Sequence, residues 1–520
     1  MEALDWLVIG VFFLALIGII VWVVRQKQND SADYFLGGRD ATWLAIGASI
    51  FASNIGSEHL IGLAGAGASS GMAMAHWEIQ GWMILILGWV FVPFYTRSMV
   101  YTMPEFLERR YNPQSRTILS VISLVSYVLT KVAVTVYAGG LVFQQVFGIK
   151  ELWGIDFFWI AAIGLVVLTA LYTIFGGMKS VLYTSVLQTP ILLLGSLIIL
   201  VLGFKELGGW DEMMRVCGAV TVNDYGDTMT NLIRSNDDAN FPWLGALIGS
   251  AIIGFWYWCT DQFIVQRVLS GKNEMEARRG TIFGAYLKLL PVFLFLIPGM
   301  IAFALHQKYI GAGGEGFLPM LANGTANADA AFPTLVAKLL PAGVKGLVVC
   351  GILAALMSSL ASLFNSSAML FTIDFYKRFK PETPEKKLVG IGQIATIVIV
   401  VLGILWIPIM RSVGDVLYTY LQDVQSVLAP GIAAAFLLGI CWKRTSAQGG
   451  MWGLIAGMVI GLTRLGAKVY YSNAGEVADS TFKYLFYDMN WLFFCGWMFL
   501  FCIIVVIVVS LATEAPTAEK

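Results

Sequence analysis

Long hydrophobic runs alternate with short polar segments along almost the entire chain. Thirteen runs are long enough to cross a bilayer as a helix, which takes about 20 residues. They cover approximately residues 4–24, 42–70, 75–96, 117–146, 155–175, 181–204, 242–266, 281–305, 335–376, 388–410, 414–440, 447–470 and 489–512. Because backbone groups in hydrocarbon must be hydrogen-bonded within the protein, the runs predict helices. We therefore expect an all-α polytopic membrane protein with about 13 transmembrane helices.

Positive charge is distributed unequally between the two sets of segments that separate the runs. The set that begins with 25–41 and includes the C-terminal tail holds 20 of the 33 Lys and Arg residues, and the opposite set holds 7. The side richer in Lys and Arg is cytoplasmic. We therefore expect a protein of the cell membrane (plasma or inner membrane) whose N-terminus lies outside the cell and whose C-terminus lies in the cytoplasm. The start of the chain carries Glu2 and Asp5 rather than basic residues, and Arg25 follows the first run, so this run is expected to be retained rather than cleaved.

The composition narrows the class of protein further. Hydrophobic residues make up 58% of the chain and charged residues 13%, with zero net charge, whereas a soluble domain carries about 25% charged residues. Zero net charge gives no indication of a nucleic-acid partner, and no obligate protein partner is evident. The cysteines form no C-x-x-C pair and are expected in the core, except Cys217 in the acidic segment 205–241, which is expected at the surface. The sequence also lacks the His, Cys and paired-carboxylate patterns of a membrane-embedded enzyme.

Small and polar residues interrupt the second run, in Ala52-Ser-Asn-Ile-Gly-Ser57 and at Gly62, Gly65 and Gly67. Carbonyl groups released by such a break are tolerated at mid-membrane where they line a cavity or bind an ion. Alternatively, the small residues allow close packing of helices. The ninth run contains a candidate partner, Ala354-Ala-Leu-Met-Ser-Ser-Leu360. Two adjacent hydroxyls suit a hard cation such as Na⁺, although serines in membrane helices also bond to carbonyls of their own helix.

Several hydrogen-bonding side chains lie within otherwise apolar runs. An ionisable group at this depth is costly and indicates a functional site. The candidates are Asn54, His59, Glu78, Lys288 and Gln422. Their mixture of donors and acceptors suits a neutral polyhydroxylated ligand, and the aromatic run Gly254–Gln262 suits the apolar faces of a sugar ring. The alternative is that Glu78 and Lys288 form a buried ion pair that only holds helices together.

Taken in order, these motifs resemble those of the solute:sodium symporter family, within its sodium/glucose cotransporter branch. The resemblance extends from about Asp33 to Arg464. It rests on Asp33-Tyr-Phe-Leu-Gly-Gly-Arg39, Ala52-Ser-Asn-Ile-Gly-Ser57, Tyr101-Thr-Met-Pro-Glu-Phe106, Gly176-Gly-Met-Lys-Ser180, Trp256-Tyr-Trp-Cys-Thr-Asp-Gln262, Val265-Gln-Arg267, Ser358-Ser-Leu-Ala-Ser-Leu-Phe-Asn365 and Phe371-Thr-Ile-Asp-Phe-Tyr376.

The resemblance implies a leucine-transporter-like core of two inverted five-helix repeats, with alternating access around a site at the membrane midplane. The implied activity is symport of Na⁺ with a hexose of the glucose or galactose type. The corresponding division is a first helix and cytoplasmic loop in 1–41, the first repeat in 42–204, an extracellular loop in 205–241, the second repeat in 242–440, and two further helices with a short tail in 441–520.

The same resemblance implies roles for individual residues. Na⁺ is expected to bind to the backbone carbonyls of Ala52, Ile55 and Ala355 and the hydroxyls of Ser358 and Ser359. The sugar is expected to bind to Asn54, His59, Glu78, Trp258, Lys288 and Gln422. Tyr257 is expected to stack beneath the ring as the inner gate. The outer hydrophobic gate is expected to consist of Leu63, Trp77 and Tyr418.

Two positions depart from the pattern of the family. Tyr183-Thr-Ser185 has serine where relatives that bind a second sodium ion often have aspartate, so we expect one Na⁺ per sugar. Gly254 stands where relatives have a polar residue that faces the ligand, which can change sugar selectivity. Transport of another polyol, such as myo-inositol, is the first alternative. A passive channel for polar solutes is the alternative from a different class, and it predicts flux that does not saturate.

Overall fold

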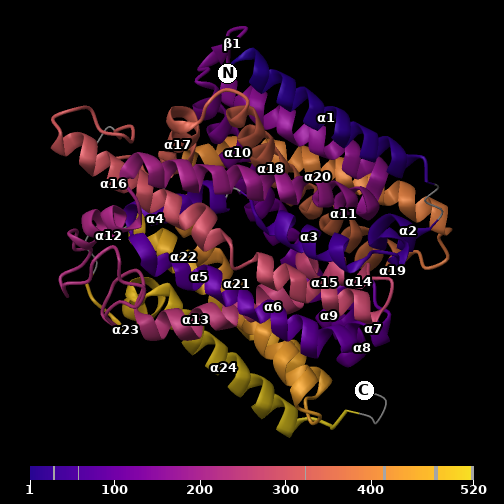
Figure 1. Cartoon of the computed structure of the whole chain (residues 1–520). Coiled ribbons are helices and arrows are strands. Elements are labelled where there is room, and N and C mark those ends of the chain that lie inside the picture. The colour runs from indigo at the N-terminus through magenta and orange to yellow at the C-terminus, as the bar shows by residue number, and fades with distance from the viewer. Residues whose placement is uncertain (27–29, 57, 322–323, 414–416, 474–477, 517–520) are drawn as a thin grey trace.

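The computed structural model describes the chain from Met1 to Pro516 except residues 27–29, 57, 322–323, 414–416 and 474–477, and leaves the side chains of 129–130, 409–423 and 473 undescribed. The described residues are largely helical, which confirms the expected all-α class (Figure 1). Their strands β1 (Glu151–Leu152) and β2 (Ile155–Asp156) form one short antiparallel hairpin.

The helical segments follow one another in chain order. The first half of the chain contains α1 (Ala3–Val24), α2 (Ser31–Leu36), η1 (Gly37–Arg39), α3 (Trp43–Asn54), η2 (Glu58–Leu63), α4 (Ala64–Ser69), η3 (Gly71–Met74), α5 (Ala75–Ile79), η4 (Gln80–Trp82), α6 (Met83–Ile86), η5 (Leu87–Phe91), α7 (Val92–Ser98), α8 (Met103–Arg110), α9 (Pro113–Ser126), η6 (Tyr127–Val132), α10 (Ala133–Phe147), α11 (Phe157–Leu207) and α12 (Trp210–Gly218).

The second half contains α13 (Trp243–Phe255), η7 (Trp256–Thr260), α14 (Gln262–Leu269), α15 (Glu274–Leu287), η8 (Val292–Leu296), α16 (Ile297–Gly311), η9 (Ala328–Ala330), α17 (Ala331–Leu339), α18 (Val344–Met369), η10 (Leu370–Tyr376), α19 (Lys377–Phe379), α20 (Glu385–Val413), α21 (Leu417–Cys441), α22 (Ala447–Asn473), α23 (Thr481–Lys483), η11 (Tyr484–Asp488) and α24 (Trp491–Ala512).

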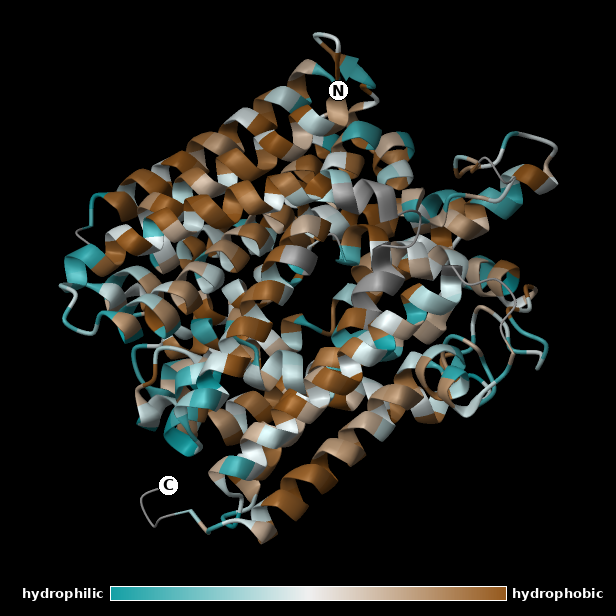
Figure 2. Ribbon diagram, turned by 180° about the vertical axis from the view of Figure 1, so that it is seen from behind, coloured by the Kyte–Doolittle hydropathy of each residue, from teal (hydrophilic) through white to brown (hydrophobic). Residues whose placement is uncertain are grey.

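Ten helical stretches in the described part of the chain are long and apolar enough to cross a membrane. Helices with brown, hydrophobic surfaces run through the body of the molecule, and teal residues gather in the connecting loops (Figure 2). The difference from thirteen has a structural origin. The runs 155–175 and 181–204 are joined in α11, and 42–70 and 117–146 are divided into shorter helical segments.

The long helix α11 changes direction sharply at Gly177, whose φ of 52° and ψ of −147° are not helical. A side chain at this position would collide with the backbone of Tyr34 in α2, and L-residues other than glycine avoid such backbone angles. The sharp turn at Gly177 lies in the segment predicted to separate the fifth and sixth runs.

Helices from the two predicted repeats pack closely against each other. The main contacts join α11 to α18 and α3 to α15, and α4 lies against α16. A side chain on Gly67 would collide with the backbone of Leu296, and one on Gly299 with the backbone of Ala64. Close packing therefore explains part of the glycine content of the second run. The division of the chain into 42–204 and 242–440 as inverted repeats stays a prediction.

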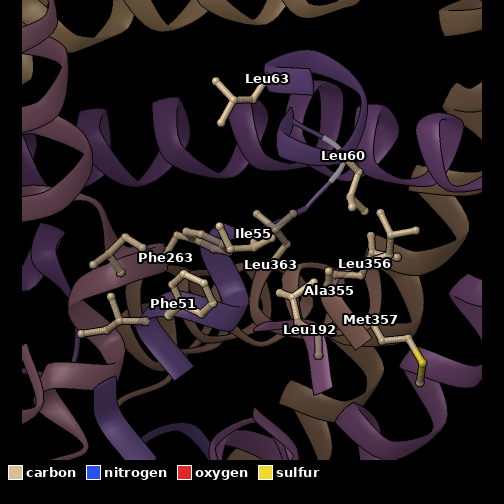
Figure 3. Packing of buried hydrophobic residues seen from close by; sticks show 14 of the residues in the cluster. Phe51, Ile55, Leu60, Leu63, Leu192, Phe263, Ala355, Leu356, Met357 and Leu363 are labelled. Atoms are coloured by element: carbon tan, nitrogen blue, oxygen red, sulfur yellow. The ribbon is translucent and has the colours of Figure 1, made fainter. Parts of the chain in front are cut away.

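The second run is also broken, at the point where its sequence predicts a break. Helix α3 ends at Asn54, and Ile55 has an extended backbone with φ of −77° and ψ of 105°. The chain continues in the π-helix η2, whose looser turns often occur at functional sites. Figure 3 shows Ile55 next to Leu363 and Ala355 of α18. The broken segment therefore lies against the ninth run.

Cys217 is fully buried, so the expectation that it lies at the surface is wrong. Although 205–241 is acidic, its helix α12 is amphipathic and packs against α16, with the Cys217 thiol 3.8 Å from the carbonyl oxygen of Met300. Cys441, expected in the core, is exposed instead because it lies at the C-terminal end of α21.

We expect a membrane-impermeant maleimide to modify Cys441 readily from the side on which it is exposed and to leave Cys217 unmodified in the folded protein. Burial raises the pKa of the Cys217 thiol to about 12, and the thiolate is the reactive form. Mass spectrometry of labelled peptides from a right-side-out and an opened vesicle preparation measures both sites. Detergent denaturation should make Cys217 reactive, and modification of Cys217 before denaturation would contradict its buried position.

Candidate functional site

A small polar cavity lies between the broken second run and three other segments of the chain. Its lining comes mainly from η2, α5, η7 and the end of α15. The lining residues are Asn54, Glu58, His59, Trp77, Glu78, Gln80, Ile253, Tyr257, Trp258, Lys288 and Gln425. Six of the seven side chains expected to hold the solute are therefore brought together, although they come from positions more than 200 residues apart.

Glu78 and Lys288 form an ion pair in this cavity. The Lys288 Nζ lies 2.6 Å from Glu78 Oε2, and the two residues are only 4% and 2% exposed, respectively. Removing two charges from water is costly, and the cost is offset only by good geometry and further hydrogen bonds. His59 supplies such a contact, with its Nε2 2.7 Å from Lys288 Nζ.

The contact with Lys288 determines which nitrogen of His59 carries the proton. An ammonium group can only donate hydrogen bonds, so Nε2 accepts and the proton of the neutral ring is assigned to Nδ1. Glu78 Oε1 lies 3.2 Å from the same Nε2 and can approach closely because the Lys288 charge is adjacent. The Nδ1–H group is left free to donate to a ligand.

Three buried polar atoms of the cavity have neither a hydrogen bond nor an ion-pair partner among the residues that the structure describes. They are Asn54 Oδ1, His59 Nδ1 and Gln80 Oε1. Buried polar groups are normally hydrogen-bonded, so each unsatisfied group calls for an explanation. Together they offer two acceptors and one donor, a combination that matches hydroxyl groups, which both donate and accept.

The cavity is contracted in the described conformation. Its free volume of about 30 Å³ corresponds to about two water molecules. A ring-shaped solute therefore requires the side chains that line the cavity to move apart. Separation of the Glu78–Lys288 pair is suited to this step, because hydroxyl groups of a solute can replace each partner of the pair.

Tyr257 forms one wall of the cavity and is fixed from several sides. Its hydroxyl accepts a hydrogen bond of 2.9 Å from Asn54 Nδ2, and its ring lies edge-on to Trp258 with centroids 4.9 Å apart. The ammonium group of Lys131 lies 4.6 Å from the centre of the Tyr257 ring. This placement is compatible with the expected role of Tyr257 as a gate.

Lys131 forms a second buried ion pair that sequence reasoning missed. Its Nζ lies 2.7 Å from Asp261 Oδ2, and the hydroxyl of Tyr127 donates to the other oxygen of Asp261. Both charged residues lie in predicted membrane runs, so the rule that drew attention to Glu78 and Lys288 could have found them. The pair joins η6 to the backbone break between η7 and α14.

The residues expected to bind Na⁺ lie together at the break. Ala52, Ile55, Ala355, Ser358 and Ser359 are all buried. A Cβ atom on Gly56 would lie 3.2 Å from Ser359 Oγ, which shows how closely α18 approaches the broken segment. Two adjacent hydroxyls beside a break in the backbone are suitable ligands for a hard cation.

The hydroxyls of this pair are not engaged with their own helix in the described part of the chain. Ser362 donates to the carbonyl oxygen of Ser358 at 2.7 Å, but neither Ser358 nor Ser359 makes the corresponding bond. Ser358 Oγ instead lies 3.3 Å from Ser185 Oγ, which is also 3.4 Å from Ser49 Oγ. Back-bonding therefore does not account for the Ser-Ser pair, and Ser185 places a neutral group beside it.

The structure describes the side chains of two of the three residues that are expected to form the outer gate. Trp77 lines the cavity and lies edge-on to Trp491 with centroids 5.5 Å apart, while Leu63 is buried in the main hydrophobic core. Tyr418 of the gate and Gln422 of the solute site lie outside the residues whose side chains are described. Their roles stay predictions.

Four further lining residues were missed: Glu58, Gln80, Ile253 and Gln425. Gln425 lies three positions after Gln422 on α21, and residues three apart share a helix face, so the sequence alone does not tell which amide enters the cavity. The position of the Gln80 side chain in the cavity depends on Gly254, because a Cβ atom at residue 254 would lie only 2.7 Å from Gln80 Oε1. The missing side chain at Gly254 leaves the space that the Gln80 amide fills.

Comparison with known proteins places the chain among transporters. Residues 34–457 match the Sodium:solute symporter family. Sodium/myo-inositol cotransporter 2 of Mus musculus is 37% identical over 533 residues, which cover 100% of this chain and 78% of the relative. Sodium/glucose cotransporter 1 of Ovis aries is 37% identical over 537 residues, covering 100% of this chain and 80% of the relative.

Solved structures share the fold at low sequence identity. A Na⁺-coupled sialic acid symporter in a substrate-bound outward-open state has a TM-score of 0.79 at 21% identity, covering 99% of both chains. MhsT in complex with L-phenylalanine has a TM-score of 0.52 at 12% identity, covering 91% of this chain and 99% of MhsT. These similarities confirm the leucine-transporter-like fold expected from the sequence motifs.

Proposed function

Because the chain belongs to the sodium:solute symporter family, we propose that it couples the entry of Na⁺ to the uptake of a hexose by alternating access. Sodium-coupled solute symport by a multi-pass membrane protein follows from the family itself. Four further points are proposals: that the solute is a hexose, how many ions enter with each solute molecule, which residues bind the ion and the solute, and how the termini are oriented.

The observation that carries the proposal is the cavity around the Glu78–Lys288 pair. It offers two carboxylates, from Glu58 and Glu78, together with an ammonium group, amide groups and a neutral imidazole, and Tyr257 and Trp258 lie on one side. The described lining therefore carries no excess of positive charge, which an anionic solute would favour, and this suits a neutral solute better than an anion. Hydroxyl groups of a hexose would satisfy the unpaired atoms of Asn54, His59 and Gln80.

Na⁺ is proposed to act by joining the broken segment to α18. Ala52, Ile55, Ala355, Ser358 and Ser359 would hold the ion where the two elements meet. A bound ion stabilises the conformation in which these groups are close, and it shifts the equilibrium by its difference in affinity for the two states. One charge that moves inward at −100 mV gains about 2.3 kcal/mol, which supports roughly a fifty-fold solute gradient.

Myo-inositol is the second candidate solute. It is a neutral polyol of similar size, so the same donors and acceptors suit it, and sodium/myo-inositol cotransporter 2 of Mus musculus is a 37% identical relative. Gly254 and Gln80 are the positions that we expect to influence the choice, because the Gln80 amide fills the space that a larger side chain at Gly254 would occupy.

The test is uptake of labelled glucose, galactose and myo-inositol into proteoliposomes, each measured with an inward gradient of Na⁺, K⁺ or choline. We expect glucose or galactose to accumulate above its external concentration only with Na⁺, and more strongly when the vesicle interior is negative. Accumulation of myo-inositol alone would replace the hexose by the second candidate. Equal, non-saturating uptake in all three salts would favour a channel and end the proposal.

We expect one Na⁺ to enter with each solute molecule. Ser185 places a neutral hydroxyl beside Ser358, where a second ion would favour a negative charge. The ratio can be measured from parallel fluxes of radioactive sodium and labelled solute, with solute-free vesicles as the control for leak. A measured ratio of two would contradict the assignment.

A further inference from the structure

A second small cavity adjoins the solute cavity and shares a wall with it. Its free volume is about 10 Å³, close to the space of one water molecule. Its lining is Ser53, Asn54, Gly56, Glu58, Lys131, Thr135, Tyr257, Phe263, Ser359 and Leu363. Asn54, Glu58 and Tyr257 line both cavities. These three side chains therefore separate the solute from the region that contains Ser359 and the backbone break.

Glu58 differs from the other carboxylates around the two cavities. Glu78 is paired with Lys288, and Asp261 is paired with Lys131. Within the described residues, the Glu58 carboxylate forms neither an ion pair nor a hydrogen bond. It is half-buried at the start of η2. A carboxylate at this depth is costly unless a positive charge accompanies it.

A second observation also points to a ligand in the shared wall. Asn54 is 7% exposed, and its Oδ1 has no hydrogen-bond partner in the described part of the chain, while its Nδ2 is engaged with Tyr257. An amide oxygen, a carboxylate and the hydroxyl of Ser359 thus border one small space. All three are hard oxygen donors of the kind that alkali and alkaline-earth cations prefer.

We propose that the carboxylate of Glu58 is the counter-charge and an oxygen ligand of the transported monovalent cation, together with Asn54 Oδ1 and Ser359 Oγ. The proposal rests on the proposed function and adds a charged residue to a cation site otherwise built from carbonyls and hydroxyls. Lys131 also borders this space and attracts the Glu58 carboxylate electrostatically. In the described part of the chain, however, it forms its ion pair with Asp261 and not with Glu58, and its ammonium group lies against the rings of Tyr257 and Phe263.

The shared wall also gives a physical route for coupling. A cation bound to Glu58 fixes the orientation of Asn54 and Tyr257, which line the solute cavity as well. The solute then binds to a wall that is already ordered, so each ligand strengthens the binding of the other by the same factor. Coupling between the two sites therefore requires only a single layer of side chains.

The experiment compares wild type, Glu58→Gln, Glu58→Asp and Glu212→Gln, each purified in detergent without solute. Thermal unfolding is followed by tryptophan fluorescence at increasing NaCl, with KCl added to keep the ionic strength constant. In Glu58→Gln, which keeps the size and hydrogen-bonding capacity of the side chain, we expect the Na⁺ concentration for half-maximal stabilisation to rise about tenfold. The matched control changes Glu212, which lies in α12 outside both cavities and is paired with Arg215, and it should behave as wild type.

A second variant at Glu58 and an uptake measurement distinguish loss of the charge from misfolding. Glu58→Asp retains the charge and should stay within about threefold of wild type, which separates loss of charge from misfolding. Uptake by Glu58→Gln at saturating Na⁺ should recover most of the affinity for solute. A Na⁺ dependence of Glu58→Gln within about twofold of wild type would overturn the proposal. Because the thermal measurement needs no solute, it tests Glu58 even if none of the three sugars is transported, in which case only the proposed solute class fails.

Discussion

Replacing Lys288 by methionine is expected to abolish solute uptake and to lower the free energy of unfolding by about 3–5 kcal/mol. The change leaves the Glu78 carboxylate, which is 2% exposed, without its ion-pair partner. It also removes the donor that fixes the ring of His59. An uncompensated buried charge is the main cause of the expected loss of stability.

A double variant separates the two interpretations of this ion pair. Removing Glu78 as well, in Glu78→Met/Lys288→Met, eliminates the unpaired charge and should recover most of the lost stability, because a buried pair can be exchanged for apolar groups at little cost. Uptake should stay absent, since the hydroxyl-binding groups are gone. If the double variant regains both stability and uptake, the pair only holds helices together.

The measurement uses thermal unfolding in detergent for stability and proteoliposome uptake for function. Lys386→Met is the matched control, because Lys386 is an exposed lysine near the start of α20 and lies outside both cavities. It should change neither quantity. Uptake by Lys288→Met at wild-type affinity would remove Lys288 from the solute site.

Replacing Ser359 by alanine is expected to raise the Na⁺ concentration for half-maximal uptake by about tenfold, equivalent to roughly 1.4 kcal/mol of binding free energy. The hydroxyl of Ser359 lies at the break beside Gly56 and borders the second cavity. Because coupling is reciprocal, the apparent affinity for solute should fall by a similar factor when Na⁺ is below saturation. At saturating Na⁺, the affinity for solute should approach the wild-type value.

Ser250→Ala provides a control of the same chemistry. Ser250 is buried in α13, and its hydroxyl donates to the Ala246 carbonyl of its own helix. Its removal should leave the dependence on Na⁺ unchanged. A Ser359→Ala protein that keeps the wild-type dependence on Na⁺, or loses affinity for solute equally at all Na⁺ concentrations, would contradict the assigned cation site.

The segments of this chain that are helical could be read from its sequence. Each of the thirteen hydrophobic runs contains helix in the structure, because burial in lipid imposes length and apolarity on each segment separately. The break after Asn54 was also predictable from a local density of Gly and Ser. Glu78 and Lys288 could be selected singly, since the cost of a charge in an apolar helix depends on the residue and its depth.

The partners of these residues were decided by the tertiary structure. Glu78 and Lys288 are 210 positions apart, and no local pattern indicates that helices α5 and α15 bring them together. The same holds for Lys131 with Asp261, and for the choice of Gln425 and Gln80 as lining residues. Tertiary packing also decided the position of Cys217: the acidic segment 205–241 contains an amphipathic helix that packs onto the core and buries this residue. Hydrophobicity and helix length are properties of one segment, whereas a binding site depends on how separate helices pack.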